Sequence, residues 1–419
     1  LRYHRIAEHH GSRISLTITK DPLCQQSDIS EVAKSTVPVL ELDKFPEEIV
    51  HLIHSRMPLR DAAHAACVSR SFLHSWRRYP NLVFSWQTFG LDMNEGTPYG
   101  RAKKLVDIIQ TILKNHSGTG VKTLKLQARP CRNVITADQL DTWLQAAVKA
   151  GIVELALDLP QFYGLKRLKM IEINAPKVST FLFRGSPMKI SISNSSQLNS
   201  MTMNGQCYSG MFQYALTKLQ SITSNLQTLT LLSSREAFNM PVSPDKFLHL
   251  RNLKIYCCGM ENFDFFFSGF FSQCLSYTGK FLLIGPHFDV RRDSIIHEDS
   301  SADASDTRRV AEFHQRNLKK VAITGFCSAK SLIELTCQIL ESSSSLLYLV
   351  LDTTGGYDNT GICDYMERKA VMEALRGVEA IQKYIKGKVP SSVTLEVLER
   401  CGRCHIPKLH KLGPGLVIG

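Results

Sequence analysis

The sequence has no apolar run long enough to cross a membrane. A transmembrane helix needs about 18 or more consecutive apolar residues. The longest candidate, residues 263–275, is shorter and is interrupted by Asp264, Ser268 and Gly269. We therefore expect no membrane span, and we interpret residues 263–275 as buried core.

The first residues also lack the continuous apolar stretch of a secretory leader. They carry Arg2, Arg5, His9 and His10 instead. Without export, the 12 cysteines are expected to be reduced and mostly buried, not joined in a disulfide framework. We therefore expect a cytoplasmic or nuclear protein.

Few features of the sequence suggest catalysis. It contains no G-x-S-x-G turn, and Gly355-Gly356 lacks the lysine and the spacing of a phosphate-binding loop. Only Cys401, Cys404 and His405 form a chemical pattern, C-x-x-C-H, which is that of haem attachment or of three zinc ligands. No convincing fourth ligand accompanies them, so we favour a turn with incidental thiols after a strand at 393–399. We predict no enzyme, no cofactor and no metal.

The formal net charge is +12, but no long basic run carries it. The lysines and arginines occur as scattered doublets, at 103–104, 291–292, 308–309 and 319–320. We interpret them as solvated faces and do not expect nucleic-acid binding. Basic residues clustered on one face of the fold would favour the alternative, a nucleic-acid-binding protein.

Residues 40–91 predict a compact module of three helices. Pro46 suits the start of a first helix, in which Ile49, Leu52 and Ile53 recur at helical spacing. Pro58 ends that helix, and Ser69 is a suitable N-cap for the third helix. About 40 residues cannot build a large core of their own. The module is therefore either one corner of a larger domain or a surface for another protein.

This segment resembles an F-box. The likeness rests on Phe45-Pro46, on residues 57–61 (MPLRD), on residues 68–70 (VSR) and on Trp76, with Phe45 in place of the usual leucine. The resemblance implies docking onto the Skp-type adaptor of a cullin–RING ubiquitin ligase. Carried over by position, the docking residues are Phe45, Pro46, Ile49, Val50, Ile53, Met57, Pro58, Val68 and Trp76.

From Val121 onward, short segments of alternating apolar residues recur. Strand-like pairs occur at 124/126, 155/157, 229/231, 253/255, 321/323 and 349/351, and several follow one another at 24 to 31 residues. Helix-like segments such as 330–343 lie between them. Between 171 and 203 the strands come about every ten residues, which leaves room for turns but not for helices. This pattern predicts an α/β solenoid of leucine-rich-repeat type, with a parallel sheet on its concave side. An ordinary α/β domain is the alternative.

Residues 100–406 resemble the repeat domain of plant F-box/leucine-rich-repeat proteins, including those with FBD-like C-termini. The likeness is carried by residues 173–193, 249–259 and 317–353, whereas residues 159–167 and 261–288 depart from the usual repeat. We predict a flexible segment at 1–39, the F-box at 40–91 and the solenoid at 100–360. An acidic, serine-rich loop is expected at 293–306, an FBD-like helix-plus-strand cap at 361–406 and a tail at 407–419.

Together these features predict the substrate-recognition subunit of an SCF-type ubiquitin ligase. The F-box would bind the Skp-type adaptor, and through it the cullin, while the repeats would hold an unknown target protein. The main alternative is a repeat scaffold that binds a partner without ubiquitination. No residue is expected to perform bond chemistry.

Overall fold

A computed structural model describes the chain from Phe45 to Arg400, with gaps. The described residues are 45–91, 96–128, 131, 134–149, 151–159, 170–185, 189–193, 196–205, 211–215, 225–233, 247–257, 275, 277–285, 293–296, 315–355 and 368–400. Contact analysis separates residues 1–44 from residues 45–419. The elements below all belong to the second unit.

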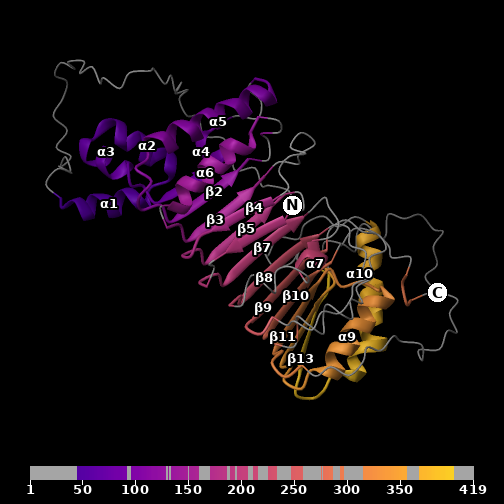
Figure 1. Cartoon of the computed structure of the whole chain (residues 1–419). Helices are drawn as coiled ribbons and strands as arrows, with labels where there is room; N and C mark the ends of the chain where they lie inside the picture. The colour runs from indigo at the N-terminus through magenta and orange to yellow at the C-terminus, as the bar shows by residue number, and fades with distance from the viewer. Residues whose placement is uncertain are drawn as a thin grey trace, which may run out of the picture. The chain divides into compact units, whose positions relative to one another are not determined.

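Three short helices open this unit (Figure 1). They are α1 (Glu47–Arg56), α2 (Leu59–Val68) and α3 (Arg70–Trp76). Met57 is extended between α1 and Pro58, and the Ser69 side chain accepts from the backbone N–H of Phe72 at 3.4 Å. The predicted helix stop and the predicted N-cap are both confirmed.

An eleven-stranded parallel sheet forms the body of the unit. Its strands, in spatial order, are β1 (Asn81–Phe84), β2 (Thr123–Gln127), β3 (Glu154–Asp158), β5 (Thr180–Arg184), β7 (Ser200–Gly205), β8 (Thr228–Ser233), β9 (Asn252–Cys257), β10 (Lys280–Ile284), β11 (Lys320–Thr324), β12 (Tyr348–Asp352) and β13 (Thr394–Leu398). The order follows the chain, as a solenoid requires.

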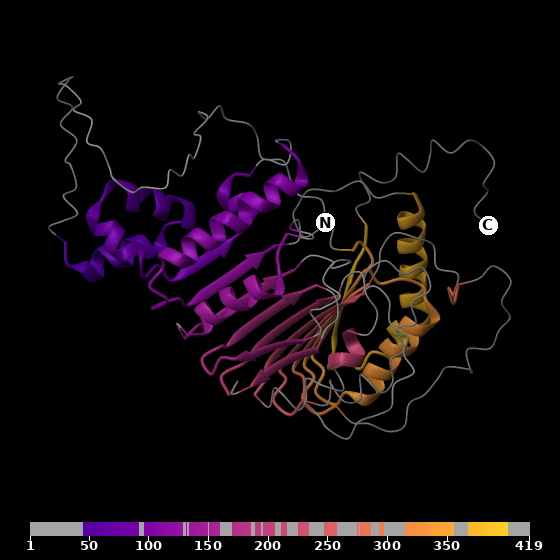
Figure 2. The same ribbon diagram turned by 45° about the horizontal axis from the view of Figure 1, so that its top comes forward.

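Helices occupy one side of this sheet. The longer ones are α5 (Pro98–Asn115), α6 (Ala137–Lys149), α9 (Lys330–Ser342) and α10 (Arg368–Ala380), and the shorter elements are α4 (Trp86–Phe89), α7 (Met211–Tyr214), η3 (Ile381–Ile385) and η4 (Lys386–Lys388). Figures 1 and 2 show α5 and α6 beside the first strands, and α9 and α10 beside the last. The prediction of an α/β leucine-rich-repeat solenoid after a helical module is confirmed.

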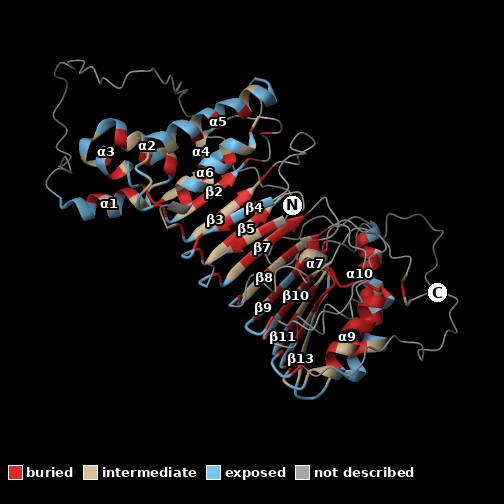
Figure 3. Cartoon of the chain, in the orientation of Figure 1, coloured by how far each residue is buried: buried red, intermediate tan, exposed pale blue. Residues whose placement is uncertain are grey.

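Alternate strand residues point into the core, as predicted. Leu124, Leu155, Leu229, Leu253 and Leu349 are each no more than 1% exposed. They pack in one continuous cluster with the apolar residues of α5, α6 and α9. In Figure 3, buried positions alternate with less buried positions along the strands. The other strand residues form the opposite, open face of the sheet, which these helices do not cover.

Between 171 and 203 the described residues contain strands and turns but no helix, as expected. The structure adds one detail to that expectation. Only β5 and β7 join the main sheet, whereas β4 (Met170–Asn174) and β6 (Lys189–Ser193) pair with each other in a second, two-stranded sheet. Their buried isoleucines, Ile171, Ile173, Ile190 and Ile192, belong to the main core. A strand pair therefore fills the space that a helix fills in the longer repeats.

Two strands of the sheet lie where the sequence predicted other structure. β1 falls inside the predicted F-box at 40–91, yet it pairs with β2 from Asn81 to Phe84. β10 falls inside the irregular stretch 261–288 and pairs with both β9 and β11. Most of residues 263–275, and residues 297–306 of the expected acidic loop, lie outside the described residues.

A repeated backbone contact marks the edge of the sheet where the strands begin. The carbonyl of the residue before a strand accepts two N–H groups from the next repeat. It does so at Pro80, Lys122, Val153, Ser179, Asn199, Gln227, Arg251, Gly279 and Lys319. Side chains at this edge are therefore held in a regular row, one per repeat, at the strand spacing of about 4.8 Å.

Candidate functional site

The helical module exposes large apolar side chains. Ile49, Leu52 and Ile53 on α1 are 39%, 52% and 39% exposed, and Val68 at the end of α2 is 87% exposed. Phe45 and Leu73 are also exposed. An apolar group left in water forgoes about 25 cal/mol per Å² of burial free energy. Such a patch on a small module marks a surface that another protein would cover.

The two faces of α1 differ in a way that the sequence pattern did not reveal. Ile49, Leu52 and Ile53 form its exposed face, while Val50 and His54 are buried at 2% and 0% exposed. The apolar periodicity therefore marks the outer stripe of this helix. The inner face uses one valine and one histidine, which is why hydropathy alone does not single it out.

The nine residues predicted for docking divide by burial. Phe45, Pro46, Ile49, Ile53, Pro58 and Val68 are exposed. Val50 is buried, and Met57 and Trp76 are partly buried and pack against the main apolar core. Val50 therefore lies on the inner side of the helix, away from the exposed apolar side chains. Leu52 and Leu73 were not predicted, although Leu52 shares the helical spacing of Ile49 and Ile53.

His54 is a fully buried polar residue of α1. Its Nε2 donates to the carbonyl of Ala62 at 2.9 Å. The rings of Phe72, Tyr79 and Trp76 surround it at centroid distances of 4.9, 5.6 and 6.2 Å. Burial lowers the pKa of His54, and the nearby His51 adds to that effect. A neutral imidazole thus joins the three helices from within.

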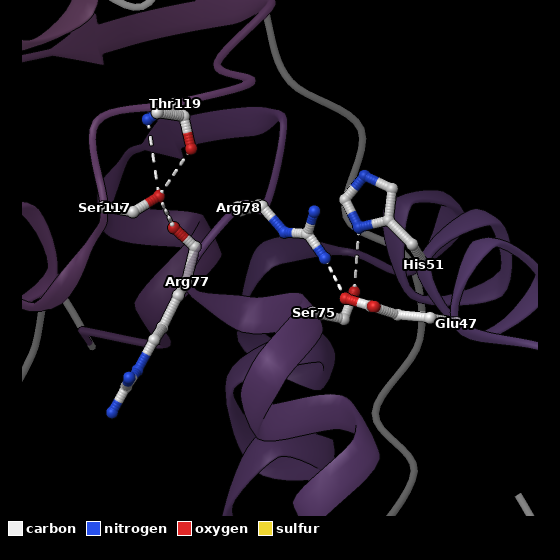
Figure 4. A network of polar contacts seen from close by, with 7 residues as sticks. All are labelled: Glu47, His51, Ser75, Arg77, Arg78, Ser117 and Thr119. Carbon is white, nitrogen blue, oxygen red and sulfur yellow. Dashed lines mark hydrogen bonds and ion pairs between the residues drawn. The ribbon is translucent and has the colours of Figure 1, made fainter. Parts of the chain in front are cut away.

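Polar contacts hold the exposed stripe in position. Glu47 accepts from Arg78, and His51 Nδ1 lies 3.0 Å from Ser75 Oγ (Figure 4). Both contacts join α1 to α3 or to the residues just after it. The backbone around the stripe is therefore already ordered before any partner binds, which lowers the entropic cost of binding.

Further contacts join the module to the sheet. The Tyr79 hydroxyl donates to the carbonyl of Met57 at 2.6 Å, and Asn81 Nδ2 donates to the carbonyl of Ser55 at 2.9 Å. Ser117, after α5, donates through its hydroxyl to the carbonyl of Arg77 at 2.6 Å (Figure 4). Burial raises the pKa of Tyr79 to about 12, so its hydroxyl stays a donor at neutral pH. The module and the first strand are thus one packed body.

No metal site is found in the described part of the chain, where no three potential ligands cluster. Cys401, Cys404 and His405 lie outside it. Of the cysteines that are described, Cys131, Cys257, Cys327 and Cys337 are buried and Cys67 is exposed. Burial of most of these described cysteines agrees with the expectation that the cysteines are mostly buried. Within the same residues, no helix combines the length and the apolar character needed to span a bilayer.

Comparison with known families follows the same division of the chain. The family model "At1g61320/AtMIF1, LRR domain" matches residues 112–166 and 161–402. The F-box domain model matches residues 42–84. No curated protein sequence matches the chain.

Proposed function

This chain belongs to the At1g61320/AtMIF1 LRR-domain family and carries an F-box domain, and from that premise we propose that it is a substrate-recognition adaptor of an SCF-type ubiquitin ligase. The apolar stripe of the F-box binds the Skp-type adaptor, which is itself bound to the cullin. The repeat sheet binds the protein to be ubiquitinated. The FBD-like character of the C-terminus and the cytoplasmic or nuclear location stay predictions.

The observation that carries this proposal is the exposed stripe of Ile49, Leu52 and Ile53 on a pre-ordered helix. Apolar groups at the centre of an interface contribute most of its binding free energy when a partner buries them. Phe45, Val68 and Leu73 extend the exposed apolar surface of the same module. The six side chains define what we call the docking surface.

The proposed mechanism is proximity. An adaptor that holds a target and a ligase together raises the effective concentration of the target's lysines near the charged conjugating enzyme. F-box and leucine-rich-repeat domains are typical of such non-catalytic proteins. No side chain of this chain has to make or break a bond in this scheme.

The test is co-precipitation of the full chain with a Skp-type adaptor. We expect Ile49→Glu and Ile53→Glu to abolish binding, because each places a charge where an apolar contact would form. Leu375→Glu, on α10, is the matched control, since Leu375 is exposed to nearly the same extent at 38%. Unchanged binding by the α1 variants would refute docking through this surface.

The scaffold alternative is separated by a second assay. The reconstituted complex with cullin, RING protein and conjugating enzyme should transfer ubiquitin to a target fused to the repeat domain. A chain that binds the Skp-type adaptor but never supports transfer would be a scaffold only.

A further inference from the structure

A groove runs along the edge where the later strands begin. It has a volume of about 1040 Å³ and extends from the residues before β7 to the start of β12. The residues that precede the strands form a regular row along this edge. Because the groove follows that row, successive repeats each contribute residues to its wall. A volume of this size holds several residues of a peptide.

The groove is basic, and the described residues that line it include no carboxylate. Its lining includes Arg251, Lys280, Lys319 and Lys320, and His249 lies beside them. Lys280 and Lys320 are register partners on neighbouring strands. Within the described residues, no carboxylate forms an ion pair with any of these four cations. Like charges on adjacent strands repel each other and destabilise the sheet. An anionic ligand bound between them would reduce that repulsion.

In the earlier strands of the same sheet, basic side chains lie beside acidic ones. On their open face Lys125 pairs with Glu154 at 2.8 Å, and Arg184 lies 3.9 Å from Asp158. Cations there are matched by carboxylates within the sheet. Among the later strands, an exposed carboxylate on the open face first comes at Glu396, on β13. Among the described residues, the later strands therefore carry an excess of positive charge that the earlier strands balance.

The groove also carries exposed apolar side chains. Leu248, Leu347 and Tyr348 are 58%, 46% and 51% exposed and line it together with Tyr277. Gly279 stands between Arg251 and Lys319 in the row and has no side chain, which leaves an opening there. A row of amides, from Asn199, Asn225, Gln227 and Asn252, completes the wall. Amides can donate to and accept from the backbone of an extended peptide.

We propose that this groove binds an acidic segment of the target protein that also contains an aliphatic or aromatic residue. The proposal rests on the adaptor function above and names the chemistry of its target. The cations would pair with the segment's carboxylates, and Leu347 and Tyr348 would cover its apolar residue. A nucleic acid would use the cations but would leave the two exposed leucines without an apolar partner, so a peptide fits the lining better.

The test is selection of random 12-residue peptides against the full chain bound to its Skp-type adaptor. We expect the selected peptides to be enriched in aspartate and glutamate around a large apolar residue. A fluorescent copy of one such peptide should bind the double variant Lys319→Glu, Lys320→Glu at least about tenfold more weakly. Binding should also weaken as salt is raised.

The control is a double variant that makes the same change in charge at a site away from the groove. Lys103→Glu with Lys104→Glu alters an exposed doublet on α5 and should leave peptide affinity unchanged. Both double variants should still bind the Skp-type adaptor, so a failure of the groove is distinguishable from a failure of the docking surface. Four results would overturn the proposal: no selected binder, no acidic enrichment, equal sensitivity of both double variants, or a 12-nucleotide single strand that outcompetes the peptide at the groove.

Discussion

The helical module and the repeat sheet differ in how far their periodic apolar side chains are buried. In the sheet, the inward residues of β2, β3, β8, β9, β11 and β12 are at most 3% exposed. In the module, six large apolar side chains between Phe45 and Leu73 remain exposed. Both parts have the periodicity that usually indicates a core.

This difference in burial suggests that the apolar residues of the sheet stabilise the fold, whereas the exposed ones of the module serve binding. Each repeat buries its leucines against its neighbours, so the sheet is stabilised from within the chain. The module buries only enough to fix its helices, through residues such as Val50, His54 and Tyr79. Its remaining apolar surface is free to stabilise a complex. Substitutions should therefore act on folding in the sheet and on binding in the module.

The largest expected effect comes from the sheet. Leu253→Ala removes a side chain that is fully buried and should lower the free energy of unfolding by about 2–5 kcal/mol. Leu52→Ala, the same substitution at a side chain 52% exposed, should change it by no more than about 0.5 kcal/mol. Chemical denaturation followed by circular dichroism measures both. Equal costs for the two leucines would break the comparison.

The next effect is on docking. Leu52→Ala and Leu73→Ala should each weaken binding of the Skp-type adaptor by about tenfold, or roughly 1.4 kcal/mol. Titration calorimetry on the purified chain measures this directly. Leu347→Ala, at an exposed leucine of the groove, should leave that affinity unchanged, and a comparable loss there would show that the docking surface is wrongly placed.

Much of the sheet could be predicted from the sequence because its periodicity has a single cause. Leu229, Leu231, Leu253 and Ile255 alternate with polar residues since only one face of each strand is buried. The same alternation at Leu82 and Phe84 was overlooked, because β1 is four residues long and lies in a segment that resembles an F-box. β10 was missed because the phenylalanine-rich residues before it obscure where the strand starts.

The docking surface was harder to predict for a physical reason. On α1 an apolar stripe and a buried stripe coexist, and periodicity cannot say which of them faces the core. The sequence suggested both Ile49 and Val50, and only the burial of Val50 and His54 in the structure separates the two stripes. The groove was not predicted either, because its cations come from strands that are distant in sequence.

A smaller effect is expected at the joint between module and sheet. Tyr79→Phe removes the hydroxyl that donates to the Met57 carbonyl at 2.6 Å and should lower the free energy of unfolding by about 0.5–1.5 kcal/mol. Tyr99→Phe is the control, since that side chain is 64% exposed. If Tyr79→Phe also left stability unchanged, the hydrogen bond would not contribute to joining the two parts.

The smallest effect is a dependence on pH that arises mainly in the module. Burial lowers the pKa of His54, and burial likewise lowers the pKa values of His51 and His116. Above the ordinary histidine value of 6.5 both folded and unfolded states are neutral, and this contribution is constant. As the pH falls through 6.5 the unfolded chain takes up protons first, so the folded state loses stability.

Denaturation midpoints at pH 7.5 and 5.5 test this dependence. The wild-type chain should be less stable at pH 5.5. His54→Asn should lose stability at both pH values but show a smaller difference between them, with His51 and His116 supplying the remainder. His74→Asn, at an exposed histidine, should keep the full difference. The sheet core is made mainly of apolar residues that do not titrate. If His54→Asn left the stability difference between pH 7.5 and pH 5.5 unchanged, the pH-sensitive groups would lie outside the buried centre of the module.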